Sequence, residues 1–245
     1  MNPSAELTIC TSVTGRYVEF LPAWAASIAA LTTKPARVIV IGNGLGPRDR
    51  LAAPAAVREL DCPRIFFDLR FDNCGTIRNR ALAQVETPWA MHLDADDVLL
   101  PDALDQVAAV AEGADVVSLG YRQWWPENSH GYQREVVYPV LDGVQALGQV
   151  PRIASGCSPF RTALWRQWHY PEQLEAGWDY GLWLGFAHLG ARFRPTPRPA
   201  FLYRQWTGSH WRMVGQHRHD DLLTLRRALE QDFTAAQSAN LGRAA

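Results

Sequence analysis

The stretch that decides the fold is Trp89-Ala90-Met91-His92-Leu93-Asp94-Ala95-Asp96-Asp97, an apolar run that ends in three acids within four positions. A short apolar run of this kind is typical of a buried strand. In open α/β sheets, ligands bind beyond the carboxyl ends of the strands, which is where these acids would emerge. Carboxylate oxygens suit Mg²⁺ or Mn²⁺, and such ions commonly bridge protein carboxylates to substrate phosphates. The stretch therefore predicts a divalent cation and a nucleotide diphosphate at a strand tip.

Strand and helix patterns alternate around this stretch. We expect strands at 7–11, 37–41, 64–67, 89–93, 114–119 and 201–203, helices at 20–31, 76–85, 101–110, 177–189 and 220–233, and a proline-rich connector at 195–199. A strand, a helix and a strand in succession indicate parallel pairing with a right-handed crossover. No glycine-rich phosphate loop follows the first strand, so the cation is left to neutralise the phosphates. The expected fold class is α/β, with a mixed, mostly parallel central sheet flanked by helices.

Composition limits the class of protein. The chain has 245 residues, 47% of them hydrophobic and 20% charged, which suits one domain or one domain with a small appendage. A net charge of −1 gives no reason to expect nucleic-acid binding. The sequence predicts no signal peptide and no transmembrane segment, because no apolar stretch approaches the roughly 20 residues of a span. Four scattered cysteines favour reduced thiols and a cytoplasmic location.

Two neighbouring blocks resemble the family 2 inverting glycosyltransferases of the GT-A fold. Residues 75–82 read GTIRNRAL and precede LDADD at 93–97 and a proline at 101. They are similar to the G-x-x-x-R-N block and the metal-binding D-x-D of that family. The resemblance runs from about residue 7 to 209. It implies a GT-A (Rossmann-like) domain over 1–215, with a nucleotide-binding half at 1–119 and an acceptor-side half at 120–215, followed by a C-terminal helix and tail at 216–245.

The resemblance implies separate roles for the acids of the D-x-D. Asp94 would contact the ribose or the base, and Asp96 would bind Mn²⁺ or Mg²⁺. A departing nucleotide diphosphate gains negative charge, so carboxylates beside it are useful only with a cation between them. The alternative, a solvated turn or a helix cap, is the preferred interpretation for Asp97 alone.

Other matching positions surround the nucleoside in this family. They are Thr11, Ser12, Asn43 and Arg78. The family usually has an acid near position 43, whereas an asparagine both donates and accepts, which leaves the base preference open. An equally good interpretation of Asn43 is a left-handed turn residue between two glycines.

A further block carries the expected catalytic base. Residues 177–184 read GWDYGLWL and are similar to the E-D-x-D-L-W-L block, in which the second acid deprotonates the acceptor hydroxyl. Asp179 matches that acid, while Trp178 and Gly181 replace the other two acids. A carboxylate in an aromatic-walled pocket suits late proton removal from an attacking hydroxyl. The alternative is an acid favoured by the helix dipole.

Several weaker candidates complete the expected site. Trp124 and Trp178 offer apolar faces for sugar stacking, and Arg204 and Arg212 offer charge for phosphate or acceptor. The remaining arginines between residues 181 and 219 are interpreted as a solvated face. The family often has a metal-binding histidine where this chain has Trp206, and His210 is the nearby substitute.

The main hypothesis is a metal-dependent inverting glycosyltransferase of the hexosyltransferase type. It would use a nucleotide-diphosphate sugar donor and a hydroxyl acceptor on a glycan, a lipid-linked sugar or a protein. A nucleotidyltransferase is one alternative, although the first strand lacks the basic glycine-rich loop of that class. A noncatalytic sugar-nucleotide or carbohydrate-binding module is another, and it stays open because positions 43, 178 and 181 lack acids.

Overall fold

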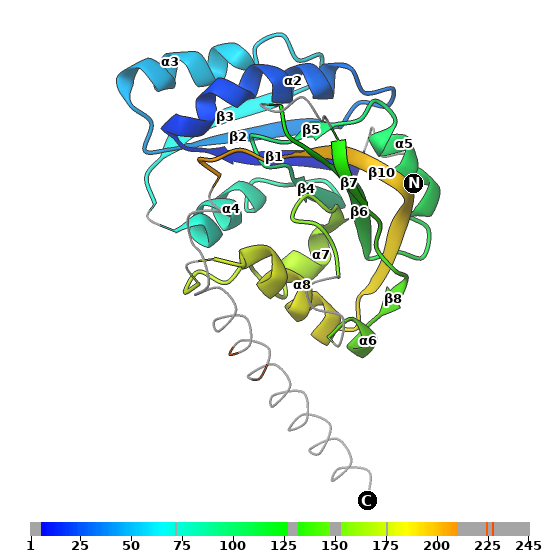
Figure 1. The fold of residues 1–245 in the computed structure, drawn as a ribbon. Helices are drawn as coiled ribbons and strands as arrows, with labels where there is room; N and C mark the ends of the chain where they lie inside the picture. The colour runs from blue at the N-terminus through cyan, green and yellow to red at the C-terminus, as the bar shows by residue number, and fades with distance from the viewer. Residues whose placement is uncertain are drawn as a thin grey trace, which may run out of the picture.

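The computed structural model describes residues 6–71, 73–126, 132–147, 153–174 and 176–209, together with 224 and 227. Within these ranges a ten-stranded sheet forms the centre of the molecule, and helices cover both of its faces (Figure 1). The strand order is β3-β2-β1-β4-β9-β6-β10-β5, with β7 paired to β6 and β8 paired to β10.

The first part of the sheet is entirely parallel. It consists of β1 (Leu7–Val13), β2 (Arg37–Asn43), β3 (Arg64–Leu69) and β4 (Trp89–His92). The connections contain η1 (Gly15–Phe20), α2 (Leu21–Ala29), α3 (Pro47–Ala56) and α4 (Cys74–Leu82). Because β1 lies between β2 and β4, the carboxyl ends of these three strands meet at one edge of the sheet. The strands expected near these positions are confirmed.

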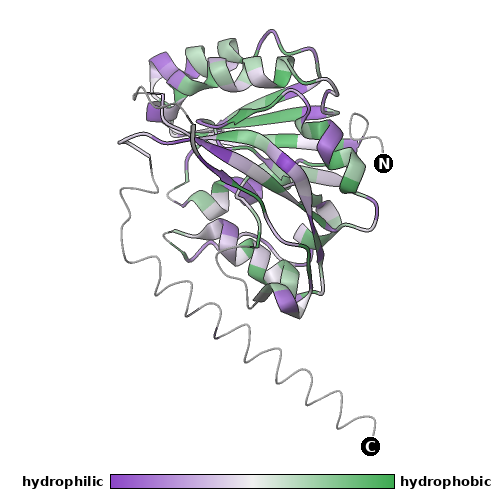
Figure 2. Ribbon diagram, turned by 45° about the vertical axis from the view of Figure 1, so that its right-hand side comes forward, coloured by the Kyte–Doolittle hydropathy of each residue, from purple (hydrophilic) through white to green (hydrophobic). Residues whose placement is uncertain are grey.

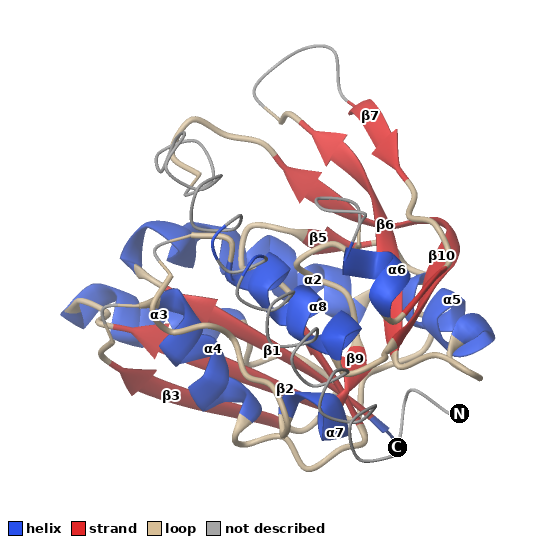
Figure 3. Ribbon diagram, turned by 90° about the horizontal axis from the view of Figure 1, so that it is seen from below, coloured by secondary structure: helices blue, strands red, loops and turns tan. Residues whose placement is uncertain are grey.

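The second part of the sheet is mixed. It contains β5 (Val98–Leu99), β6 (Val116–Trp124), β7 (Tyr132–Val136), β8 (Leu141–Asp142), β9 (Phe160–Arg161) and β10 (Arg192–Arg204). Its helices are α5 (Ala103–Val110), α6 (Val144–Leu147), α7 (Thr162–Trp165) and α8 (Trp178–His188). β9 joins the two parts by pairing antiparallel with both β4 and β6. β6 and β10 are parallel and extend with β7 beyond the rest of the sheet (Figure 3).

Alternating side chains of the buried strands fill two cores. In β2, Val38 and Val40 face the core beneath α2, α3 and α5, whereas Ile39 and Ile41 face the core beneath α4 and α8. This is the period of two that a strand imposes, and both faces are apolar because helices cover both. The apolar residues accordingly concentrate on the strands between the helical layers (Figure 2).

The connector predicted at residues 195–199 is wrong, because these residues lie within β10. Proline cannot donate to a sheet ladder, and the pairing of β10 with β6 shifts register between Pro195 and Pro199 and again before Phe201. The Thr196 hydroxyl replaces a backbone partner by accepting a hydrogen bond from the Gly120 nitrogen at 3.0 Å. Strand β10 therefore continues through the prolines with irregular, bulged pairing.

Helix α3 has no counterpart among the predicted elements. It contains Pro54 in its interior, it buries only Ala53, and Leu51 is 76% exposed. A helix with so little apolar face gives no periodic pattern to detect. The helix expected at 220–233 and the tail at 216–245 lie outside the described residues, apart from positions 224 and 227.

Two further expectations concern the whole chain. Among the described helices, none has the length and apolar character needed to cross a membrane. All four cysteines are free thiols, and Cys10 and Cys157 are buried.

Candidate functional site

A cavity of about 540 Å³ lies at the edge where the carboxyl ends of β1, β2 and β4 meet. Its lining includes most of the residues predicted for the site: Ser12, Asn43, Arg78, Asp94, Asp96, Trp178, Asp179 and Arg204. They come from the ends of β1 and β2, from α4, from the turn after β4, from the start of α8 and from the end of β10. The fold thus brings together segments that lie far apart in the sequence.

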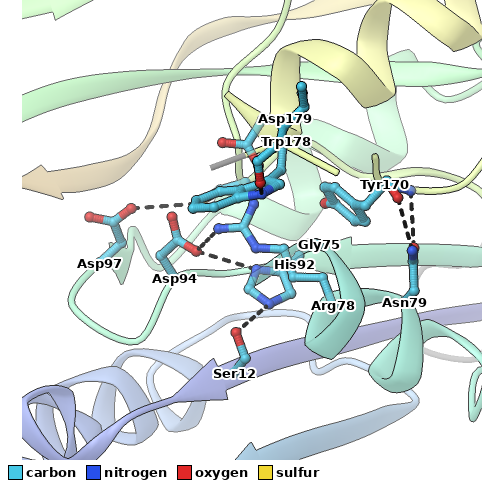
Figure 4. A network of polar contacts seen from close by, with 12 residues as sticks. Ser12, Gly75, Arg78, Asn79, His92, Asp94, Asp97, Tyr170, Trp178 and Asp179 are labelled. Carbon is cyan, nitrogen blue, oxygen red and sulfur yellow. Dashed lines mark hydrogen bonds and ion pairs between the residues drawn. The ribbon is translucent and has the colours of Figure 1, made fainter. Parts of the chain in front are cut away.

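Arg78 lines this cavity and lies at the centre of a network of polar contacts (Figure 4). Its Nη2 donates to Asp94 Oδ1 at 2.7 Å, and its Nη1 donates to Asp179 Oδ1. The rings of Tyr170 and Trp178 flank the guanidinium, with centroids 5.4 and 6.0 Å from Cζ. Burial alone would lower the pKa of Arg78, but the two carboxylates raise it well above its usual value. One buried cation therefore links the acid at the tip of β4 to the acid of α8.

Asp94 and His92 form a second contact at this edge. His92 Nδ1 lies 3.3 Å from Asp94 Oδ1, and His92 Nε2 lies 3.3 Å from Ser12 Oγ. Burial would raise the pKa of Asp94, but the positive charge of Arg78 holds it well below its usual range. Burial and Arg78 both lower the pKa of His92, so the imidazole is neutral at pH 7. The sequence analysis missed His92, although a polar residue two positions before Asp94 shares its side of an extended chain.

Asp96 accepts hydrogen bonds from two residues at and just after the end of β10. Trp206 Nε1 donates to Asp96 Oδ2 at 2.9 Å, and Arg204 Nε donates to the Asp96 carbonyl at 2.8 Å. Tyr17 and Phe20 pack edge-on against Trp206, with ring centroids 5.4 and 5.0 Å away. Burial and the negative charge of Asp94 raise the pKa of Asp96 to about 6. The positive charge of the nearby Arg204 lowers this pKa but does not offset burial and Asp94.

Asp97 is directed into the protein. Its Oδ1 accepts from the Arg204 backbone nitrogen at 2.9 Å, and its Oδ2 accepts from Cys157 Sγ at 3.4 Å. Burial and the charge of Asp96 raise the pKa of Asp97 well above its usual range. The interpretation of Asp97 as a solvated turn or a helix cap is wrong, because the residue is 1% exposed and the N-cap of α5 is Asp102. Its contact with Arg204 instead fastens the end of β10 to the turn after β4.

Ligand types suited to a metal gather at two places around these acids. Asp94, Asp97 and Cys157 have ligand atoms within 4.8 Å of one another. Burial raises the pKa of the Cys157 thiol, which is hydrogen-bonded to Asp97, so this trio is a poor match for a hard cation. Asp94 and Asp96 instead line the cavity and offer carboxylate oxygens. The residues present therefore fit Mg²⁺ or Mn²⁺ at Asp94 and Asp96.

Asp179 is the second residue of α8, which begins after Gly177 in the left-handed conformation at φ 75°. A Cβ added to Gly156 would lie 2.7 Å from Asp179 Oδ2, so the backbone of Gly156 forms the wall behind the carboxylate. The side chain of Asp179 is 29% exposed and faces the cavity. Sequence reasoning missed Gly156, because only the three-dimensional approach of two segments identifies it.

Asn43 does not adopt the left-handed turn conformation considered for it. The left-handed residue is Gly44, with φ 65°, and the described residues include no non-glycine residue with positive φ. The Oδ1 atom of Asn43 accepts a hydrogen bond from the Phe71 nitrogen at 2.8 Å. The side chain thus ties β2 to the segment after β3 at the wall of the cavity.

Some expected site residues lie elsewhere. Thr11 is fully buried and Trp124 is outside the cavity lining, so neither is placed for direct contact. The Trp124 ring stacks on the Arg204 guanidinium at 4.2 Å, and Phe20 stacks on it at 4.8 Å. His210 and Arg212 lie outside the described residues.

Three arginines of β10 pair with surface acids instead of lining the cavity. The pairs are Arg192 with Asp115, Arg194 with Asp142 and Arg198 with Asp102. This arrangement matches their interpretation as a solvated face, and it leaves Arg204 as the β10 arginine that lines the cavity.

A mixed, mostly parallel sheet between two helical layers, with a cavity at the carboxyl ends of its first strands, defines the GT-A fold expected from the resemblance. No family model and no curated protein matches the sequence. Among solved structures, the chain is similar to Staphylococcus aureus TarS 1–349 in complex with UDP-GlcNAc, with a TM-score of 0.72 and 17% identity over 91% of this chain and 66% of that one.

Two further TarS 1–349 structures show the same likeness. One has a TM-score of 0.65 at 16% identity, covering 81% of this chain and 60% of that chain. The other, in complex with UDP, has a TM-score of 0.65 at 17% identity, covering 82% and 60%. The present chain thus spans 60 to 66% of the length of these structures. At this identity the likeness establishes the fold, and the predicted fold class is confirmed.

Proposed function

We propose that this chain is a glycosyltransferase that moves a hexosyl group from a nucleotide-diphosphate donor to a hydroxyl acceptor, with inversion at the anomeric carbon. The observation that carries the proposal is the Arg78 network, which joins Asp94 to Asp179 across one cavity. The fold shared with TarS, whose solved complexes contain UDP-GlcNAc and UDP, supports a nucleotide sugar as the donor.

The donor would bind along the carboxyl ends of β1 and β2. Ser12 and Asn43 offer hydrogen bonds to the nucleoside, and Asp94 would accept from the ribose or the base. Arg204 would meet the diphosphate, because Phe20 and Trp124 hold its guanidinium between them. In this proposal Thr11 and Trp124 support the site without touching the substrate.

A divalent cation, Mn²⁺ or Mg²⁺, would be held by Asp94 and Asp96. The raised pKa of Asp96 supports this assignment, since its cause is burial beside a second carboxylate. Trp206 contacts Oδ2 of Asp96, whereas Arg78 and His92 both contact Oδ1 of Asp94, so the other oxygen of each carboxylate would bind the cation. When bound, the cation would supply positive charge that stabilises the departing diphosphate.

Asp179 would act as the base. The acceptor oxygen forms a bond to the anomeric carbon while the bond from that carbon to the diphosphate oxygen breaks, and the nucleotide diphosphate leaves from the opposite side. The hydroxyl proton passes to the Asp179 carboxylate. Arg78 orients that carboxylate, and the indole of Trp178 offers a face on which a sugar ring can stack.

The acceptor would be a hydroxyl of a glycan, a lipid-linked sugar or a protein. We place the reaction in the cytoplasm on the basis of the four free cysteines, since reducing compartments keep thiols unpaired.

A panel of nucleotide-diphosphate sugars, incubated with Mn²⁺, tests the proposal. We expect slow release of the nucleotide diphosphate from at least one sugar, and loss of that release in Asp96→Ala. Binding without release would identify a noncatalytic module. Release of pyrophosphate from a nucleoside triphosphate and a sugar phosphate would identify a nucleotidyltransferase.

A further inference from the structure

Asn79 follows Arg78 in α4 but contacts a different part of the molecule. Its Oδ1 accepts from the Tyr170 nitrogen at 3.0 Å and from Trp165 Nε1 at 3.1 Å. Its Nδ2 donates to the Tyr170 carbonyl and to Glu172 Oε1, both at 2.9 Å. Asn79 is 9% exposed, and these four bonds use the whole hydrogen-bonding capacity of its amide.

The segment that Asn79 holds leads directly to the proposed base. Asn73 Nδ2 donates to the Leu174 carbonyl at 2.7 Å, and Trp178 Nε1 donates to the same carbonyl at 2.7 Å. A Cβ on Gly75 would lie 2.4 Å from the Pro171 carbonyl oxygen, so α4 and this segment touch backbone to backbone. Described residues from 170 onward are therefore fastened to α4 before the chain enters α8.

Arg78 and Asn79 position different parts of the segment that carries Asp179. The ion pair from Arg78 orients the carboxylate, but a long, flexible guanidinium stem does not fix where the backbone of α8 begins. The Asn79 amide binds both backbone groups of Tyr170, and Figure 4 shows this pair beside the Arg78 network. One helix thus sets both the direction of the carboxylate and the position of the chain that carries it.

We infer that Asn79 is a positioning residue for Asp179, holding the base at its working distance from the donor acids without touching the substrate. The inference rests on the proposed function, since it takes Asp179 as the base. A misplacement of about 1 Å can reduce turnover by roughly 100-fold without affecting the binding of a distant part of the substrate. Replacing a residue that is needed only for stability would not lower turnover while leaving nucleotide binding unchanged.

Asn79→Asp is the informative change. One carboxylate oxygen still accepts from Tyr170 and Trp165, but the other oxygen replaces the donor Nδ2 and therefore repels the Tyr170 carbonyl and the Glu172 carboxylate. The probes are UDP for binding and the nucleotide sugar that the wild type hydrolyses for turnover, both with Mn²⁺. We expect kcat to fall by roughly 10 to 100-fold while the Kd of UDP changes by less than about threefold. Glu172→Gln added to this variant supplies a donor and should restore part of kcat.

Glu172→Gln alone is the matched control, because its amide oxygen still accepts from Asn79. Trp165→Phe is a milder variant that removes one of the four bonds, and it should lower kcat by a few fold even if Asn79→Asp does not fold. Equal kcat in folded Asn79→Asp and wild type, or equal losses in kcat and UDP binding, would overturn the inference alone. A wild type that binds no nucleotide and hydrolyses no nucleotide sugar would overturn the proposed function and this inference with it.

Discussion

Arg78 contacts both the acid proposed to bind the nucleotide and the acid proposed to act as the base. Its guanidinium contacts Asp94 on the nucleotide side and Asp179 on the acceptor side, and its own side chain is only 8% exposed. Taking a lone arginine out of water is costly, and two carboxylates compensate that cost. The same pairing binds Asp94 to Nη2 and Asp179 to Nη1 of one planar group, which orients the two carboxylates relative to each other.

Asp179→Asn separates binding from proton removal. The amide oxygen can still accept from Arg78, but the side chain no longer takes a proton. We expect donor affinity to stay within about threefold and turnover to fall by roughly 10² to 10⁴-fold. Calorimetry with UDP and a coupled assay for nucleotide release measure the two quantities. Asp102→Asn makes the same change at a surface acid and serves as the control; full turnover in Asp179→Asn would remove Asp179 from the mechanism.

Asn43 provides a test of base preference. Its Oδ1 accepts from the Phe71 nitrogen, so the part of the amide that remains for a ligand is the donor Nδ2. Asn43→Asp keeps the Phe71 contact and offers an acceptor in place of that donor. Cytosine has an acceptor at N3 and uracil a donor, so we expect the affinity for UDP relative to CDP to rise by roughly tenfold or more. An unchanged ratio in titrations of both nucleotides would mean that Asn43 does not contact the base edge.

Trp206 provides a test of the cation site. Trp206→Phe keeps an aromatic ring beside Tyr17 and Phe20 but removes the N–H that holds Asp96. Loss of an outer partner of a metal ligand typically weakens metal binding, and we expect the Mn²⁺ affinity measured with UDP present to fall by about tenfold. Trp168→Phe is the control, because it removes an indole N–H that lies outside the cation site and donates to the Gly181 carbonyl of α8. Equal Mn²⁺ affinity in both variants would show that Trp206 does not support a cation ligand.

At the scale of elements, α4 connects the Asp94 side of the cavity to the Asp179 side. It is capped by Asn73, whose Oδ1 accepts from the Gly75 and Thr76 nitrogens. Gly75 then allows close approach to Pro171, and Arg78 and Asn79 reach the two sides of the Asp179 segment. Residues 75–79 therefore hold the segment that leads to Asp179 close to α4.

Gly75→Ala tests the close approach of α4 to Pro171. The new Cβ would lie 2.4 Å from the Pro171 oxygen and 2.9 Å from Asn73 Oδ1, so backbone must move. We expect a loss of about 1 to 3 kcal/mol in the free energy of unfolding, measured in urea. Gly46→Ala is the control, since its Cβ would meet only one atom, at 3.9 Å. Equal stability of the two variants would contradict a tight contact between α4 and residue 171.

The sequence predicted the elements whose patterns are local. The buried strands β1, β2 and β4 and the helices α4 and α8 carry strong apolar runs or periodicity, and all are present. The proline run in β10 was misread because the ladder tolerates it through register shifts and the Thr196 hydroxyl. The site acids were named from their motifs, and His92 has a local signal in its position two residues before Asp94. Gly156 and the Trp206 contact depend on distances between segments and have no local pattern.

At the scale of the whole molecule, the cavity lies at the edge of a sheet whose strands come from both halves of the chain. Eight of the predicted site residues line one cavity although they come from six separate segments. Ligand binding to such an edge should stabilise the whole fold, because each segment is part of the same sheet or packs on it.

A thermal shift measurement tests this linkage and the cation together. A nucleotide diphosphate at 100 times its Kd stabilises the fold by about 2.7 kcal/mol, which corresponds to a rise in Tm of roughly 5 to 10 °C for a domain of this size. We expect the rise with UDP and Mn²⁺, and little of it with excess chelator or in Asp96→Ala. Equal shifts with and without chelator would contradict a cation at Asp94 and Asp96.

The fastening of Asp97 to the Arg204 nitrogen has a consequence for synthesis. The two residues are 107 positions apart, so the acid emerges from the ribosome long before its partner. Until β10 arrives, β5 lacks the strand it pairs with and the turn that carries Asp94 and Asp96 lacks its anchor. Domains fold as units during translation. A nascent chain that stops short of β10 therefore contains all three acids that line the cavity but lacks Tyr203 and Arg204, which complete its wall.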